Sequence, residues 1–233
     1  MTVFDEKTGR PVPNLRAENF VVMDGDLRLT VNSAEFTEEI LDLMLIADAS
    51  FLGEAIQPIL APMIRNAPDD AQIALVTYDQ SATLVQDFTN DKDQLLAVSS
   101  RITHGNNPRV LDALYAVLDG GFEGSPGRRV AVVLSSGAEG RSRSRLSEVV
   151  ELAQRRDAAV FVAFAQGVDA RLFQELAEKT GGAWFHLKKL KLSPAESAAL
   201  VHSTLRGSYT LDVSGASKFG DRLRVCLLYT SDA

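Results

Sequence analysis

The sequence lacks several features that would tie it to common classes of protein. Only one of its 233 residues is cysteine, Cys226, so an internal disulfide is excluded. No apolar run reaches the length of about 18 residues that a membrane span needs, and the N-terminus resembles no signal peptide. The net charge of −7 and the pI of about 5.0 provide no basic surface for nucleic acid. We therefore expect neither a nucleic-acid partner nor a membrane span in this chain.

Signatures of common enzymes are also missing. Neither Gly-x-x-x-x-Gly-Lys-Ser/Thr nor Gly-x-Gly-x-x-Gly occurs, which argues against dinucleotide binding. The Ser-Ser-Gly of residues 135–137 lacks the preceding glycine of a hydrolase nucleophile elbow, and the three histidines show no triad spacing. Three alternating arginines, Arg141, Arg143 and Arg145, would suit an anionic group, although a solvated loop before a helix is the simpler interpretation.

The order of apolar segments predicts an α/β fold. Residues 43–47 form a continuous apolar run, typical of a strand buried on both faces of a sheet, and strand and helix patterns alternate after it. We expect a doubly wound, mostly parallel sheet. Its other predicted strands are 71–78, 81–86, 129–134, 158–165, 183–186 and 209–213. The predicted helices are 51–65 (interrupted by prolines), 91–102 (capped by Thr89 or Asn90), 110–118, 144–156, 169–179 (capped by Asp169) and 194–205.

Four segments are predicted along the chain. Residues 1–38 form an N-terminal β appendage with a hairpin, residues 39–213 the α/β domain, and residues 214–225 the start of a truncated continuation. Residues 226–233 match the translation of a common transposase sequencing adapter, so we interpret them as a non-native tail, although a genuine final strand would have a similar composition. Truncation would also make an internal start at Met1, and a lost signal peptide, plausible.

Asp48 is the first candidate functional residue, because it follows the first buried strand directly. Its carboxylate and the hydroxyl of Ser50 lie at the carboxyl end of that strand, where parallel sheets bind ligands. The same two side chains are equally suited to capping the free N–H groups of a following helix. The residues by themselves do not decide between a ligand site and a cap.

Several motifs, in order along the chain, resemble the von Willebrand factor type A (VWA) domain, and specifically the bacterial VWFA-related family. Residues 45–50 resemble its apolar strand followed by Asp-x-Ser-x-Ser, and residues 110–114 resemble its Leu-Tyr-Asp-Ala-Leu helix. Residues 128–135 are similar to the central strand that normally ends in Ser-Asp-Gly, and residues 180–182 to a Thr-Gly-Gly signature. The leading segment 8–25 is similar as well. The resemblance implies a Rossmann-like fold and protein binding, usually outside the cytoplasm of bacteria.

The resemblance also implies a divalent-metal site. In the family it is held by the Asp-x-Ser-x-Ser oxygens, a threonine from the next loop and the aspartate of Ser-Asp-Gly. Asp48 and Ser50 match this set, whereas the other three positions align with Leu52, Pro108 and Ser136.

These departures predict a degenerate site. Mg²⁺ takes about six oxygen ligands, and leucine and proline side chains offer none. We expect no metal cofactor, unless Thr103 or Asn107 replaces a lost ligand.

We therefore interpret the chain as a non-catalytic protein-binding module. The candidate ligand face comprises Asp48, Ser50, Pro108 and Ser136, with contacts expected from Phe51, His104 and the arginine loop. One alternative is a hydrolase that uses Asp48, for which no second acid or base is evident. Another is a purely structural domain without a specific ligand.

Overall fold

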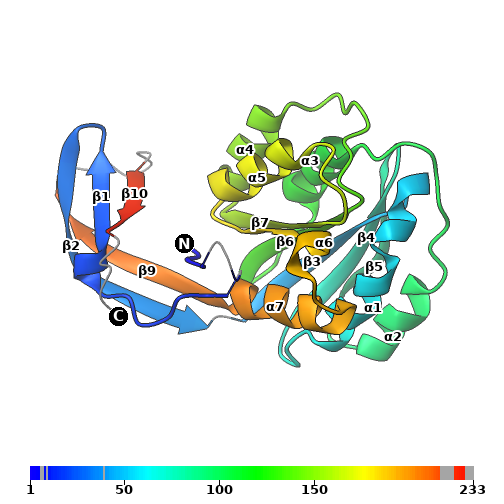
Figure 1. The fold of residues 1–233 in the computed structure, drawn as a ribbon, viewed down its shortest axis with the longest axis horizontal. Coiled ribbons are helices and arrows are strands. Elements are labelled where there is room, and N and C mark those ends of the chain that lie inside the picture. Colours follow the sequence, from blue (N-terminus) through cyan, green and yellow to red (C-terminus); the bar gives the residue numbers. More distant parts are fainter. Residues whose placement is uncertain (6–7, 9, 39, 216–222, 229–233) are drawn as a thin grey trace.

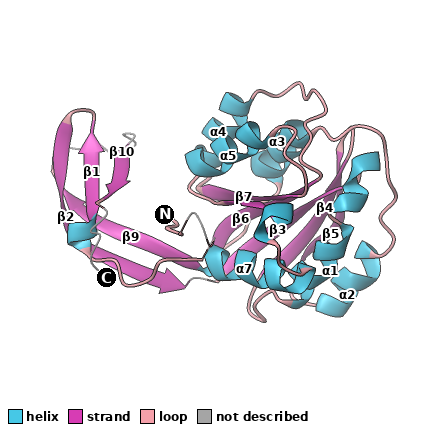
Figure 2. Ribbon diagram, in the orientation of Figure 1, coloured by secondary structure: helices cyan, strands magenta, loops and turns pink. Residues whose placement is uncertain are grey.

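A computed structural model describes residues 1–5, 8, 10–38, 40–215 and 223–228, which form two sheets (Figures 1 and 2). In the larger one the strand order is β5-β4-β3-β6-β7-β8. Neighbouring strands are parallel except β5, which is antiparallel to β4. The mostly parallel sheet predicted from the sequence is thus confirmed, except that the predicted last strand, 209–213, lies in the smaller sheet. Its strands are β3 (Leu41–Asp48), β4 (Gln72–Tyr78), β5 (Ala82–Thr89), β6 (Arg128–Ser135), β7 (Ala158–Phe164) and β8 (Trp184–His186).

Helices cover both faces of this sheet, which makes the fold doubly wound (Figure 1). Side chains of α1 (Gln57–Arg65), α2 (Lys92–Ser99) and α7 (Pro194–Arg206) pack on one face, and those of α3 (Val110–Gly120), α4 (Leu146–Arg155) and α5 (Ala170–Lys179) on the other. In β3, Leu43 and Leu45 join the first cluster and Met44 and Ile46 the second. Covering on both faces explains the continuous apolar run of this strand.

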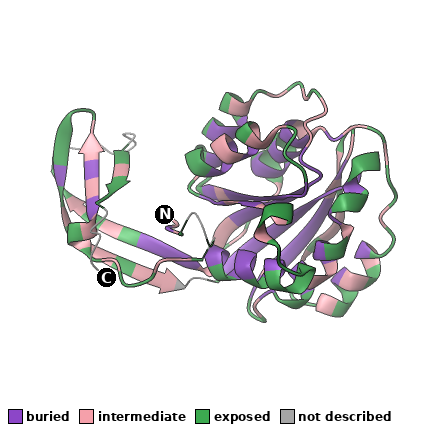
Figure 3. Ribbon diagram, viewed as in Figure 1, coloured by how far each residue is buried: buried purple, intermediate pink, exposed green. Residues whose placement is uncertain are grey.

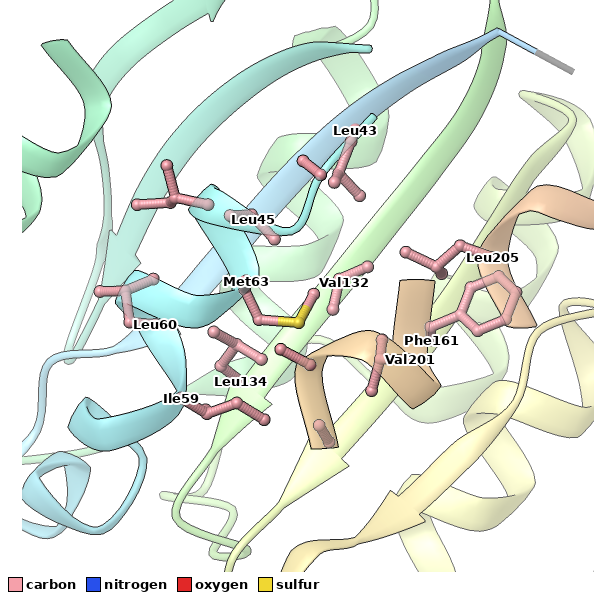
Figure 4. Close-up of a cluster of buried hydrophobic side chains, with 14 of the residues drawn as sticks. Leu43, Leu45, Ile59, Leu60, Met63, Val132, Leu134, Phe161, Val201 and Leu205 are labelled. Atoms are coloured by element: carbon pink, nitrogen blue, oxygen red, sulfur yellow. The ribbon is translucent and has the colours of Figure 1, made fainter. Parts of the chain in front are cut away.

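Figure 4 shows the core on the first face, where helix and sheet side chains meet. Met63 of α1, Leu134 of β6 and Val201 of α7 are all completely buried there. Figure 3 shows the same pattern over the whole body, with buried strands beneath helices that are exposed on their outer sides. The core therefore holds the carboxyl ends of β3 and β6 in fixed positions.

The predicted break in the helix after β3 is confirmed. A 3₁₀ turn, η2 (Phe51–Ala55), precedes α1, and Pro58 lies in the first turn of α1, where its missing N–H has no helical partner to lose. Two predicted caps were wrong. Asp91, not Thr89 or Asn90, caps α2 by accepting the N–H of Gln94 at 2.9 Å.

The second wrong cap is Asp169. It stands at the start of α5 but makes no capping hydrogen bond with its side chain, because its carboxylate accepts the N–H of Glu139 at 2.8 Å instead. A carboxylate that binds another loop is unavailable to its own helix. This contact becomes part of the site described below.

The smaller sheet has the antiparallel strand order β10-β1-β2-β9 and projects away from the body (Figure 1). Its strands are β1 (Phe20–Asp24), β2 (Leu27–Glu38), β9 (Gly207–Ser214) and β10 (Leu223–Leu227); η1 (Ala17–Asn19) precedes β1, and α6 (Leu187–Leu190) follows β8. Its small core is centred on Val3, Phe20 and Tyr209. The α/β body connects to the small sheet where α7 runs directly into β9, without an intervening loop.

Cys226 and Leu227 pair with Val21 and Phe20 in this small sheet. Residues 216–222 of the predicted continuation and 229–233 of the predicted tail lie outside the described residues. The four predicted segment boundaries, and the non-native origin of the tail, stay predictions.

Candidate functional site

Three loops meet at the carboxyl ends of β3 and β6. The N–H of Gly105, in the loop before α3, donates to the carbonyl of Ala49 after β3 at 2.6 Å. The N–H of Gly140, in the loop after β6, donates to the carbonyl of Pro108 at 2.8 Å. Main-chain hydrogen bonds therefore join the three loops into one surface, although they are distant in sequence.

Asp48 connects two of these loops through its side chain. It is completely buried, and its Oδ1 accepts the N–H of Ser50 while its Oδ2 accepts the N–H of Ser136, both at 2.9 Å. Buried N–H groups need such acceptors because water cannot reach them. The carboxylate thus holds the loop after β3 against the loop after β6.

Ser50 is the cap of the short helix that follows. Its hydroxyl is completely buried and accepts the N–H of Leu52 at 3.2 Å, at the start of η2. Gly53 packs so closely on the end of β3 that a Cβ placed there would lie 2.1 Å from the carbonyl oxygen of Asp48. Of the two interpretations left open by the sequence, the contacts match the capping of local N–H groups.

Tyr78 ends the neighbouring strand β4 and is also buried. Burial, and secondarily the charge of Asp48, raise the pKa of its hydroxyl well above the ordinary value for tyrosine. The neutral phenol is therefore the stable form beside Asp48 at physiological pH. This neighbour adds no negative charge to the site.

The predicted face residues fall into two groups. Asp48, Ser50, Pro108 and Ser136 are all buried, so they support the loops from below. Phe51 is 75% exposed, and His104 and the arginines of residues 141–145 are exposed as well. The surface available to a partner is thus made by the second group.

Sequence reasoning missed the carboxylates that organise the loop after β6. Glu139 and Asp112 accept main-chain N–H groups of that loop, as Asp169 does from its own position before α5. The acceptors and donors come from three different segments, and no local motif signals them. In the sequence, only the alternating arginines of residues 141–145 indicated that this loop is unusual.

The sequence profile of the von Willebrand factor type A domain matches residues 46–196, well over half of the chain. The chain belongs to this family. The match includes Asp48 and all three loops of the site. No curated protein sequence matches the chain.

Solved structures of VWA proteins share the fold. Proximal thread matrix protein 1 from the mussel byssus, with a zinc-occupied MIDAS motif, is 13% identical at a TM-score of 0.63, covering 78% of this chain and 50% of its own. BatB from Bacteroides thetaiotaomicron is 12% identical at 0.56, covering 70% and 95%. Manganese-loaded TRAP protein of Plasmodium vivax is 15% identical at 0.54, covering 79% and 82%. This chain spans about half of the mussel protein, and at such identities the likeness concerns the fold alone.

The residues of this VWA domain fit a divalent metal poorly. Pro108 and Leu52 carry no side-chain oxygen, and Ser136 supplies a hydroxyl in place of a carboxylate. The hydroxyl oxygen of Ser136, buried without a hydrogen-bond partner among the described residues, adds one neutral oxygen to those of Asp48 and Ser50. The oxygen set is therefore short of what Mg²⁺ requires.

The two substitute ligands considered from the sequence are placed elsewhere. Asn107 donates from its side-chain amide to the carbonyl of Gly140 at 2.7 Å, so it holds a loop together. Thr103 is exposed and lines a cavity of about 380 Å³ together with Ala49 and Asp79. Among the described residues, the hydrogen bonds of Asp48 come from Ser50 and Ser136 and not from these two side chains.

The geometry does not favour the hydrolase alternative. A nucleophile or general base must reach the reacting atom of its substrate. Asp48 is completely buried, and both of its oxygens already accept main-chain N–H groups. Its observed role is to hold loops.

Proposed function

We propose that this chain is a non-catalytic protein-binding module of VWA type whose degenerate metal site has been replaced by direct hydrogen bonds. VWA domains typically mediate protein–protein interactions, and some members do so through a metal. We thus retain protein binding as the function and propose that it does not depend on a metal. A location outside the cytoplasm, implied by the family resemblance, is proposed with it.

One observation carries the proposal. The carboxylate of Asp48 accepts the N–H groups of Ser50 and Ser136, both at 2.9 Å, and so joins the two loops directly. A cation at Asp48 would share the carboxylate with these two N–H groups and would exchange its own hydration for one carboxylate and weak hydroxyl dipoles. The loss of hydration opposes binding.

The apolar side chains on the exposed side of the loops support the binding role. Phe51 is 75% exposed and Leu52 45% exposed, directly after the buried Ser50. Val168, in the loop after β7, is 72% exposed, and the adjoining N–H of Gln166 donates to the carbonyl of Ser136 at 2.9 Å. Exposed aromatic and aliphatic side chains on a rigid support are suited to anchor a partner.

No helix in the described part of the chain is long and apolar enough to cross a membrane.

Metal titration tests the first half of the proposal. Melting temperatures are measured in EDTA, in 5 mM Mg²⁺ and in 1 mM Mn²⁺, concentrations on the order of those that saturate weak sites. The wild-type chain is expected to melt at one temperature in all three. The variant Leu52→Ser/Pro108→Thr/Ser136→Asp regains the missing oxygens and is expected to be stabilised by Mn²⁺.

The control for this titration is the same triple variant with Ser50→Ala or Asp48→Ala in addition. Either change removes a remaining ligand and is expected to abolish the Mn²⁺ effect. Ser50→Ala is the milder of the two and keeps the assay interpretable if Asp48→Ala fails to fold. Stabilisation of the wild-type chain by Mg²⁺ or Mn²⁺ would contradict the proposal.

Selection from a peptide-display library in EDTA tests the second half. We expect enriched peptides whose binding is unchanged by Mg²⁺ and is lost in Phe51→Ser, because a buried aromatic anchor dominates such interfaces. Leu84→Ser is the matched control, since Leu84 is 56% exposed but lies in β5 away from the loops. Equal loss in both variants, or binding only with added metal, would overturn the proposed role.

A further inference from the structure

The loop between β6 and α4 presents three arginines in a regular pattern. Arg141, Arg143 and Arg145 are exposed, whereas Ser142 and Ser144 between them are half-buried. The hydroxyl of Ser142 faces inward and accepts the N–H of Asp112, in the first turn of α3, at 3.2 Å. The alternation thus directs serines toward the body and arginines toward solvent.

The main chain of this loop is held by an unusual number of acceptors. Asp112 accepts the N–H groups of Arg143 at 2.9 Å and Ser144 at 2.8 Å, and Glu139 accepts that of Ser142 at 2.6 Å. Further hydrogen bonds run from Glu139 N–H to Asp169, from Gly140 N–H to the Pro108 carbonyl, and from Arg145 N–H to Glu148. A loop fixed in this way loses little conformational freedom when a partner binds.

The carboxylates that hold the loop do so through its main chain. Burial alone would raise the pKa of Asp112, but the N–H groups of Ser144 and Arg143 outweigh burial and lower it. The ion pairs of Lys92, Arg156 and Lys179 lie elsewhere, and none in the described part of the chain involves the arginines of this loop. The main chain that carries the three guanidinium groups is therefore held in place, while the groups themselves are exposed and available.

We propose that this arginine loop, residues 141–145, binds an acidic segment of a protein partner. This inference rests on the proposed function and names the partner's chemistry. Each guanidinium presents a planar fork of N–H donors that matches a carboxylate. The chain as a whole has a net charge of −7, which repels a long polyanion such as nucleic acid or a sulfated polysaccharide. A short run of aspartate or glutamate, contacting only the loop, avoids most of that repulsion.

Fluorescence anisotropy of the full chain tests the proposal. The probe is a fluorescein-labelled dodecapeptide of alternating glutamate and serine, and its control replaces glutamate by glutamine. We expect the acidic peptide to bind in EDTA and the control peptide not to bind. Arg141→Gln/Arg143→Gln/Arg145→Gln is expected to weaken binding about thirtyfold, roughly threefold for each exposed charge pair. Binding is also expected to weaken with added salt.

The matched control is Arg28→Gln/Arg65→Gln/Arg155→Gln. These arginines are exposed and lie in β2, at the end of α1 and at the end of α4. The net charge changes equally in both triple variants, so a general charge effect would weaken binding in both. A loss confined to the loop variant supports the proposal, and equal losses overturn it.

The variant Asp112→Asn tests whether the order of the loop, and not only its positive charge, contributes to binding. It removes a negative charge beside the arginines, and so charge alone predicts tighter binding. We expect binding about threefold weaker instead, because the amide oxygen that replaces the carboxylate is a weaker acceptor for the N–H groups of Arg143 and Ser144, and part of the loop's order must then be gained on binding. The control is Asp93→Asn, an exposed first-turn aspartate in α2, which is expected to leave binding unchanged.

Two further results would overturn the proposal: no binding of the acidic peptide, or equal or tighter binding of a heparin-derived oligosaccharide or a single-stranded oligonucleotide of matched charge. Failure here is distinguishable from failure of the proposed function. Display-selected peptides that bind in EDTA and depend on Phe51 would keep the binding module while removing the acidic partner. Metal binding by the wild-type chain would remove the degenerate site without affecting the arginine assay.

Discussion

Asp48 and Ser136 are 88 positions apart in the sequence, yet the N–H of Ser136 donates to Oδ2 of Asp48 across 2.9 Å. The other oxygen of the same carboxylate accepts the N–H of Ser50. Both bonds lie in a region that water does not reach, since Asp48 and Ser50 are completely buried and Ser136 is 2% exposed. One side chain thus determines how two loops of the VWA domain meet.

Asp48→Ala is expected to lower the free energy of unfolding by about 3 kcal/mol, because it leaves two buried N–H groups without acceptors. Urea denaturation monitored by circular dichroism measures the loss. Asp93→Ala, at an exposed position, is the control and is expected to cost below about 1 kcal/mol. A loss at Asp48 no larger than at Asp93 would contradict the structural role assigned to the carboxylate.

Gly137→Ala, in the loop after β6, is expected to lower the free energy of unfolding by more than the cost of placing alanine at a positive φ. Gly137 has a φ of +99°, and a Cβ there would lie 1.8 Å from the carbonyl oxygen of Gln166. Gly124→Ala is the control, because its φ is +78° but nothing lies within 4 Å of the added atom. We expect about 1 kcal/mol at Gly124 and at least about 3 kcal/mol at Gly137 in urea denaturation. Similar losses at both positions would show that the contact with Gln166 is readily relieved.

Because His202 of α7 is buried, we expect the chain to lose stability in acid. Its Nε2–H donates to the carbonyl of Met63 at 2.7 Å, and its Nδ1 is buried without a partner among the described residues. Burial, opposed by the hydrogen bond to Met63 and assisted by the charges of Lys92 and Arg206, lowers its pKa from 6.5 to about 4. Because the folded pKa lies below the unfolded one, protonation favours the unfolded chain. Its stabilising contribution is present above about pH 6.5, declines as the pH falls toward 4, and amounts to roughly 3 kcal/mol.

His202→Gln keeps a donor for Met63 and cannot titrate, so its stability is expected to change less between pH 7 and pH 4.5. Urea denaturation at several pH values measures the difference between the two slopes. His104→Gln, at an exposed histidine, is expected to retain the wild-type slope. An unchanged slope in His202→Gln would assign the acid sensitivity to other groups.

Tyr209 anchors the N-terminal segment to the small sheet. Its hydroxyl donates to the carbonyl of Val12 at 2.8 Å and accepts the N–H of Leu15 at 2.9 Å. Its ring packs between Phe20 and Phe36, with centroids 5.3 and 5.2 Å away. Tyr209→Phe keeps the ring contacts and loses both hydrogen bonds.

We therefore expect faster amide hydrogen exchange at Leu15 in Tyr209→Phe, by about tenfold, corresponding to roughly 1.4 kcal/mol of lost local stability. Exchange in β3 is expected to stay unchanged, since that strand lies in the other core. Tyr115→Phe in α3, where the side chain is 38% exposed, provides the control. Slower or unchanged exchange at Leu15 would show that the segment is held by other contacts.

Much of the α/β body could be predicted because its signals are local. The apolar run of residues 43–47 requires burial on both faces, and the structure places its side chains alternately in two cores. The family motifs likewise placed Asp48, Ser50, Pro108 and Ser136 in loops at one end of the sheet. The predicted caps at Thr89, Asn90 and Asp169 were wrong, because several nearby side chains compete for the same role and tertiary contacts select among them.

The sequence by itself determined the alternation of strands and helices and the absence of side-chain oxygens at Leu52 and Pro108, since both follow from the identity of residues at known positions. Only the tertiary structure decided what Asp48 does with its carboxylate and how the arginine loop is held. The donors for Asp48 and Asp112 are main-chain N–H groups, which every residue except proline carries. Such donors leave no mark in the sequence, and only the packing of distant segments shows which of them reach an acceptor.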